Sequence, residues 1–379
     1  SYRHNAIRYF QKVDELNPDF QTVVGSIAMK TDNEHLTAFM DLMIYQNLDE
    51  AKKELPDDLY NPFILSAAKN YLNSCDTNAI LFVNGDNDTY PLLYLQHKYG
   101  IRKDVCLINL SYLNFDRYVY LLKEKDFSDG AIKTRLTKDF IADSSRLAFI
   151  LNSLDAEPML MDEIIEFAES DEENRISAGS TIIQIPTNII LFEHEGKRLQ
   201  NEIDLKYLSK GQLIMLDIIN SNFSERPIFF GMTVSGSNFM GFTDYFSMEG
   251  FAYRLTFKKG VKQDMYIAYV NKEKLYKKLI NDFKWNGIEK NIKDKGFYSG
   301  IFRNISCQTA DRFIIDNEFE QAEKLLDNYI DLFPDHIVPY DLDMYLMIAS
   351  YYKIGKVEKA NQIFTISISN FKETRKKSN

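Results

Sequence analysis

The chain has 379 residues, of which 45% are hydrophobic and 26% charged, and its formal net charge is −10. This composition is typical of folded globular proteins, and the length predicts two or three domains. We expect no nucleic acid partner, because 45 Lys and Arg residues are scattered among 55 Asp and Glu residues and form no concentrated basic face. No apolar run approaches the roughly 18 to 20 residues that cross a bilayer, so we expect no transmembrane segment in this chain.

The three cysteines and five histidines are isolated from one another in the sequence. Their spacing matches neither a zinc site, nor a disulfide framework, nor a nucleophile triad. We therefore identify no catalytic residue from the sequence, and we expect no cofactor apart from the Mg²⁺ or Mn²⁺ considered below.

Three domains are predicted in chain order: a helical segment over residues 1–60, a Rossmann-like α/β domain over 61–270 and a helical domain over 271–379. In the first, residues 33–53 are predicted to be helical. The second opens with a helix over residues 61–74, because Pro62 stands where a first helical turn tolerates a missing N–H.

The α/β domain is organised around two apolar runs, residues 80–83 and 105–110. Neither alternates with polar residues, which predicts strands buried on both faces of a sheet. Pro91 is placed in the first turn of a helix that runs to about residue 98, and Gly100 ends it. A strand, helix, strand unit of this length predicts neighbouring parallel strands, and the run 228–233 is predicted to join the same sheet. The fold class is therefore α/β, with a Rossmann-like, mainly parallel sheet.

The segment Asp86, Asn87, Asp88 and Thr89 follows the first strand, at the sheet edge where α/β proteins bind ligands. One interpretation is a hard-cation site, in which Asp86 and Asp88 hold Mg²⁺ or Mn²⁺ and through it a phosphate. The other is structural: Asp88 or Thr89 caps the helix while Asp86 accepts N–H bonds within a turn. We favour the structural interpretation, because an Asp-x-Asp triplet is common by chance.

Further along the chain, residues 138–154 and 159–168 are predicted to be helices, and 182–185 and 189–192 to be strands of a hairpin or of two sheet edges. Ser209 is predicted to cap a helix that runs to residue 220. Glu249 precedes a strand that is predicted over residues 251–257, and Arg254 is a polar residue within that strand. They either line a ligand site or form an internal ion pair or rim contacts.

The last third of the chain is predicted to be helical. Ala322 and Ala360 stand at equivalent places in two copies of a helix-pair pattern, a little more than one tetratricopeptide repeat apart. Small residues at these places let paired helices approach closely, so packing explains them without a ligand. The domain is therefore predicted to contain repeats of tetratricopeptide (TPR) type that dock on the α/β layer.

Several blocks, in the same order, give the chain a resemblance to a known family between residues 61 and 371. It resembles the soluble C-terminal region of bacterial multi-pass membrane proteins related to protein O-mannosyltransferases of the GT-C glycosyltransferase class. The blocks that carry the resemblance include Tyr71-Leu-Asn-Ser-Cys75, Gly85-Asp-Asn-Asp-Thr89, Leu208-Ser-Lys-Gly211, Arg226-Pro-Ile-Phe-Phe230, Glu249-Gly-Phe-Ala-Tyr-Arg-Leu255 and Phe283-Lys-Trp-Asn-Gly287.

The resemblance implies an extracytoplasmic, periplasmic and membrane-associated domain that accompanies a membrane-embedded transferase using a lipid-linked sugar. In such enzymes the acidic catalytic residues belong to the membrane part. The chain is then either a piece of such a protein or a free-standing relative of its C-terminal module.

Three functions remain open at this point. The first is a non-catalytic module that binds a protein or glycan partner, including the membrane-embedded transferase part. The second is a metal-dependent enzyme that transfers a glycosyl or phosphoryl group with Asp86 and Asp88. The third is a structural subunit of an envelope assembly.

Overall fold

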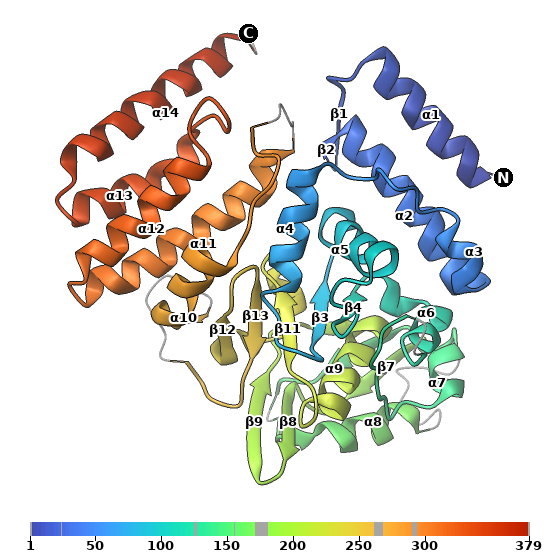
Figure 1. The fold of residues 1–379 in the computed structure, drawn as a ribbon. Coiled ribbons are helices and arrows are strands. Elements are labelled where there is room, and N and C mark those ends of the chain that lie inside the picture. The colour runs from blue at the N-terminus through green and yellow to red at the C-terminus, as the bar shows by residue number, and fades with distance from the viewer. Residues whose placement is uncertain are drawn as a thin grey trace.

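The computed structural model of the chain describes residues 2–23, 25–124, 127–154, 156–170, 181–260, 268–289 and 294–377, and it is a mixed α/β protein with a helical C-terminal part (Figure 1). The α-helices are α1 (Tyr2–Leu16), α2 (Ile27–Tyr45), α3 (Leu48–Lys52), α4 (Pro62–Leu72), α5 (Asp86–Tyr99), α6 (Asp116–Leu121), α7 (Lys138–Ala142), α8 (Met161–Glu169), α9 (Lys210–Asn222), α10 (Lys272–Lys277), α11 (Lys295–Ile315), α12 (Phe319–Leu332), α13 (Tyr345–Lys353) and α14 (Val357–Lys377). The strands are β1 (Gln21–Thr22), β2 (Gly25–Ser26), β3 (Ile80–Val83), β4 (Cys106–Asn109), β5 (Ala148–Leu151), β6 (Met159–Leu160), β7 (Ile182–Ile185), β8 (Ile189–His194), β9 (Lys197–Glu202), β10 (Tyr207–Ser209), β11 (Ile228–Gly231), β12 (Phe246–Met248), β13 (Ala252–Leu255) and β14 (Tyr269–Val270).

A six-stranded sheet with the order β14-β12-β13-β11-β3-β4 forms the centre of the molecule. Strands β11, β3 and β4 are parallel neighbours, with Ile80 opposite both Ile228 and Cys106, and all their residues are buried. The three predicted strands in one sheet, and the parallel pairing of β3 with β4, are therefore confirmed. The sheet as a whole is mixed, because β13 runs antiparallel to β11 and to β12, to which a tight turn joins it.

Two predicted helix starts are confirmed by their caps. Asn61 accepts the N–H of Ile64 at the start of α4 (3.0 Å), and Ser209 accepts the N–H of Gln212 at the start of α9 (3.3 Å). The start of α5 was predicted wrongly. This helix begins at Asp86, after Gly85 in a left-handed backbone conformation (φ 86°), so residues 86–89 are its first turn and Pro91 lies inside it. The Cβ-free backbone of glycine tolerates this φ, and it lets the helix start directly behind β3.

The helix predicted over residues 138–154 is also wrong. Only α7 is helical there, and β5 follows as the middle strand of a three-stranded sheet with the order β10-β5-β7. Residues 182–185 and 189–192 are strands, but they form no hairpin with each other: β7 pairs with β5, whereas β8 pairs with β6 and β9. Partners distant in the sequence thus decided the structure of a segment whose local pattern favoured a helix.

The helical C-terminal part docks on the central layer through α4. Trp285 stacks on Phe63 of α4 with ring centroids 5.6 Å apart, and it also contacts Phe333, which follows α12, at 5.2 Å. Helices α11 and α12 pack on each other, as do α13 and α14 (Figure 1), and the small residues Ala322 and Ala360 are fully buried. The expected docking of the C-terminal helices on the α/β layer is therefore confirmed.

Candidate functional site

The carboxyl ends of β3 and β4 meet at one edge of the central sheet, where short polar side chains link them. Asn109, the last residue of β4, donates to the Thr89 hydroxyl (2.9 Å), which in turn donates to the carbonyl of Gly85 (2.7 Å). Beside them, Ser111 donates to Asn84 (2.9 Å). The hydroxyl of Thr89 is therefore occupied in holding the first turn of α5 to the neighbouring strand.

Asp88 lies in the first turn of α5 and is buried, with 4% of its surface exposed. One carboxylate oxygen, Oδ2, accepts the hydroxyl of Thr233 from the segment after β11, and among the described residues Oδ1 has no hydrogen-bond partner. Burial raises the pKa of Asp88 to about 7, although the bond from Thr233 lowers it. Neither Asp88 nor Thr89 caps the helix as we predicted, because the capping residue is Gly85, which has no side chain to do so.

Asn87 connects α5 to two other helices. Its side-chain oxygen accepts a hydrogen bond from Asn33 of α2 (2.9 Å), and its backbone carbonyl accepts the hydroxyl of Tyr298 from α11 (2.8 Å). The second bond has a clear origin. Asn87 precedes Pro91 by four residues, and proline has no N–H to donate to that carbonyl. Tyr298 thus replaces the missing helical hydrogen bond and ties the C-terminal helices to the edge of the sheet.

Asp86 is half-buried on a different side of α5 from Asp88. Burial raises its pKa, the positive charge of Lys30 lowers it and the negative charge of Glu34 raises it, so its charged neighbours belong to α2. Within the ranges that the structure describes, no group of three or more His, Cys, Asp or Glu side chains converges as metal ligands would. The two carboxylates of the segment therefore have separate surroundings.

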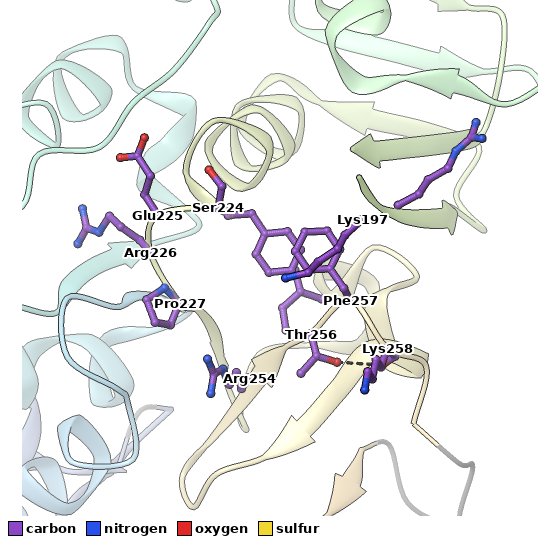
Figure 2. A pocket seen from close by; sticks show the side chains of 12 residues that line it. Lys197, Ser224, Glu225, Arg226, Pro227, Arg254, Thr256, Phe257 and Lys258 are labelled. Atoms are coloured by element: carbon purple, nitrogen blue, oxygen red, sulfur yellow. Dashed lines mark hydrogen bonds between the residues drawn. The ribbon is translucent and has the colours of Figure 1, made fainter. Parts of the chain in front are cut away.

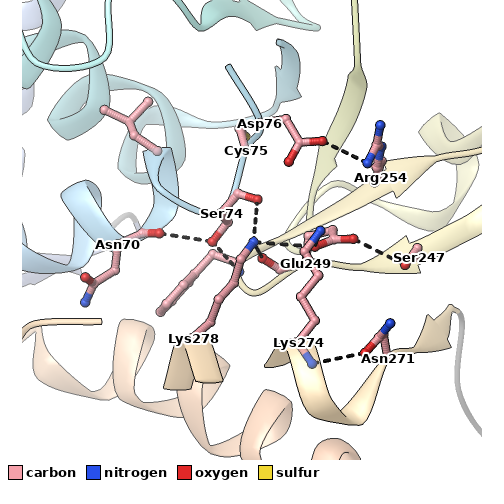
Figure 3. A network of polar contacts seen from close by, with 12 residues as sticks. Asn70, Ser74, Cys75, Asp76, Ser247, Glu249, Arg254, Asn271, Lys274 and Lys278 are labelled. Carbon is pink, nitrogen blue, oxygen red and sulfur yellow. Dashed lines mark hydrogen bonds and ion pairs between the residues drawn. The ribbon is translucent and has the colours of Figure 1, made fainter. Parts of the chain in front are cut away.

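Glu249 and Arg254 lie at the β12–β13 turn and on β13, away from the acidic segment, and each has an opposite charge as partner (Figure 3). Glu249 is buried and pairs with Lys274 (2.6 Å) and Lys278 (3.4 Å). Arg254 pairs with Asp76 (2.8 Å), and both side chains are partly exposed. Glu249 and Arg254 thus form separate ion pairs rather than one with each other.

Lys278 occupies the centre of this network. Figure 3 shows its side chain reaching between Ser74 and Glu249, and its ammonium donates to the carbonyls of both residues, at 3.1 and 2.9 Å. Burial lowers the pKa of Lys278, while the carboxylate of Glu249 raises it. The network therefore joins the end of α4, the β12–β13 turn and the helical segment after α10.

Comparison with known proteins places this architecture in a family. The family model described as TMEM260-associated domain 2 matches residues 64–274, which run from α4 to α10 and include the acidic segment and the central sheet. The chain belongs to this family. No curated protein and no solved structure matches it.

The TMEM260-associated domain 2 is associated by its description with a membrane protein family. In this chain, no helix of the described ranges is long and apolar enough to cross a membrane.

The matched region contains a cavity of about 640 Å³, and Arg254, one of the candidates from the sequence, is among the residues that line it (Figure 2). It lies beside the first residue of β11, at the edge opposite the acidic segment, and its apolar wall is the stacked pair Phe223 and Phe257, whose ring centroids are 4.2 Å apart. The ammonium of Lys197 lies 5.8 Å from the Phe257 ring. Arg226 points away from this pair in Figure 2 and donates to backbone carbonyls, among them that of Gly130 (2.7 Å), so its guanidinium is already used internally.

A second cavity of about 640 Å³ lies between the TMEM260-associated domain 2 and the C-terminal helices. Its lining comes from β13, from α11 and from the start of α13. Sequence reasoning missed it because these segments are distant in the chain and share no motif.

Proposed function

We propose that this chain is a non-catalytic extracytoplasmic module of, or related to, a membrane-embedded glycosyltransferase resembling the protein O-mannosyltransferases, and that it binds a protein or glycan partner. The observation that carries the proposal is that the side chains of the acidic segment already bind other parts of the fold. Asp88 is buried against Thr233, Asn87 is held by Asn33 and Tyr298, and Thr89 is held by Asn109. These groups act in the fold, which favours a role in binding over one in chemistry at this edge.

Two features of the fold support a binding module. The parallel strands β11, β3 and β4 with their helices support a Rossmann-like layer. The paired helices α11–α12 and α13–α14 support two TPR-like repeats. Stacked helix pairs of this kind form concave surfaces that hold partners. The proposed location is the periplasmic side of the membrane, following the resemblance to transferases that use lipid-linked sugars.

A metal-dependent transferase that uses Asp86 and Asp88 is the second candidate. One observation favours it: Oδ1 of Asp88 is buried without a hydrogen-bond partner among the described residues, and an unsatisfied buried oxygen is a place where an ion or water gains a bond. Asp86 and Asp88 have separate surroundings, which weakens this candidate.

One experiment distinguishes the binding module from the metal-dependent transferase. The immobilised chain is incubated with detergent-solubilised membranes from its source, and the retained material is assayed for glycosyl transfer from a lipid-linked donor. We expect retained transferase activity on the native chain and none on a heat-denatured control. The chain alone should show no transfer from lipid-linked or nucleotide-linked donors with Mg²⁺ or Mn²⁺ present. Turnover by the chain alone that Asp86→Asn abolishes would establish the enzyme instead, and absence of both activities would refute the association with a transferase.

A further inference from the structure

The cavity between β13, α11 and α13, here called the interdomain groove, has walls from three elements. Tyr253 comes from β13, Gly300 and Gln308 from α11, and Tyr345 from the start of α13. Its volume of about 640 Å³ is within the range of small-ligand sites and suits one or two sugar rings better than a long extended chain.

Aromatic side chains at the groove are exposed to solvent. Phe297 is 39% exposed and Tyr345 61% exposed, and both line the cavity. Large rings left in water beside a cavity offer flat apolar faces to a ligand. The C–H face of a pyranose ring is a flat partner of this kind.

Polar side chains also line the groove, and one of them has a buried oxygen without a partner among the described residues. Gln308 is buried with 7% exposed; its Nε2 donates to Asn304 (2.9 Å), and among the described residues its Oε1 has no partner. Tyr253, 3% exposed, also lines the cavity. A buried amide oxygen is normally paired, so a ligand that brings hydroxyl groups would satisfy that of Gln308, and the hydroxyl of Tyr253 adds a second hydrogen-bonding group to the same cavity.

The charges at the groove already have partners. Arg303 pairs with Asp341 (3.4 Å) and Asp343 (3.6 Å). An ionic ligand would have to compete with these pairs, whereas a neutral ligand would not.

The glycine on α11 keeps the groove open. A Cβ built on Gly300 would meet no atom within 4 Å, and Gly300 stands well inside a helix of 21 residues. Glycine at such a place lowers helix stability relative to alanine. The free space that it leaves belongs to the groove.

We infer that the interdomain groove binds a neutral sugar, with the pyranose ring against Tyr345 and Phe297 and its hydroxyl groups bonded to Gln308 and Tyr253. The inference rests on the proposed binding function and names the ligand class. Flat apolar faces, the unpaired amide oxygen of Gln308 among the described residues and charges that already have partners together match a neutral polyhydroxylated ring.

The test uses the methyl pyranosides of glucose, galactose and mannose at millimolar concentration, with binding followed by saturation-transfer NMR. We expect at least one to bind the native chain. Gly300→Leu adds a side chain to the groove at a place where its Cβ meets no atom within 4 Å, so it should abolish binding while the chain stays folded, and Tyr345→Ala should weaken binding about tenfold. The matched control is Gly296→Leu on the same helix, outside the groove and equally free of contacts, which should bind as the native chain does.

Binding of no pyranoside, or binding that Gly300→Leu leaves intact, would overturn the inference. So would binding of a Gly/Ser octapeptide alone that Gly300→Leu abolishes, because the groove would then be a peptide site. Capture of transferase activity by the native chain without pyranoside binding would refute only the sugar. Pyranoside binding without such capture would refute only the association with a transferase.

Discussion

Replacing Asp88 with Asn should stabilise the protein, and the stabilisation should be larger at alkaline pH than in mild acid. The two side chains have the same shape, and Thr233 can donate to the amide oxygen as it does to the carboxylate. The difference between them is the charge. Ionising Asp88 places a negative charge in a buried site where its Oδ1 has no partner among the described residues.

The size of the effect follows from the pKa. Burial raises the pKa of Asp88 from 3.8 to about 7, so the folded state holds this proton more tightly than the unfolded state. The stability contributed by the protonated carboxyl is complete below pH 3.8 and is lost as the pH rises through about 7. A shift of about 3 units corresponds to at most about 4 kcal/mol in the free energy of unfolding. Asp88→Asn cannot lose this contribution, because its amide stays neutral.

Urea unfolding of the native chain and of Asp88→Asn at about pH 5 and about pH 8 measures this difference. The comparison must be between variants, because burial also raises the pKa of Asp32 to about 7 and adds a similar pH dependence to both curves. A variant that is destabilised equally at both pH values would refute the reasoning. Stabilisation of the native chain by millimolar Mg²⁺ or Mn²⁺ at the higher pH, absent in Asp88→Asn, would show that the buried oxygen is a metal ligand.

Two further substitutions test the contacts that join the parts of the chain. Tyr298→Phe should lower the free energy of unfolding by about 1 to 3 kcal/mol, because it leaves the carbonyl of Asn87 unpaired. In a Pro91→Ala background, where the helix regains an N–H, the same substitution should cost much less. Equal costs in the two backgrounds, measured by urea titration, would argue against this account. Glu249→Ala should cost about 3 kcal/mol, because the ammonium groups of Lys274 and of the partly buried Lys278 lose the buried carboxylate that pairs with them. Adding Lys278→Met should recover part of the loss in thermal melts, and a double variant less stable than the single one would contradict the ion-pair explanation.

Local features of the sequence were sufficient for the centre of the fold. The mainly apolar runs at residues 80–83 and 105–110 predicted buried parallel strands, and the run 228–233 a strand of the same sheet, because only a strand covered on both faces needs no polar side. Pro62 and the cap Ser209 marked helix starts for equally local reasons: the first helical turn tolerates proline, and the Ser209 side chain bonds an N–H three residues away.

The tertiary structure decided the rest, because the deciding partners lie far away in the chain. Residues 148–151 became β5 through pairing with β7 and β10, although the local pattern favoured a helix. The first turn of α5 depends on the left-handed Gly85, and its Pro91 is tolerated because Tyr298 supplies the missing donor from more than 200 residues away. The groove between β13, α11 and α13 exists only once those segments pack together. Sequence alone thus determined which segments were apolar or capped, while burial and partners, which only the folded chain defines, determined what Asp88, Glu249 and Gln308 do.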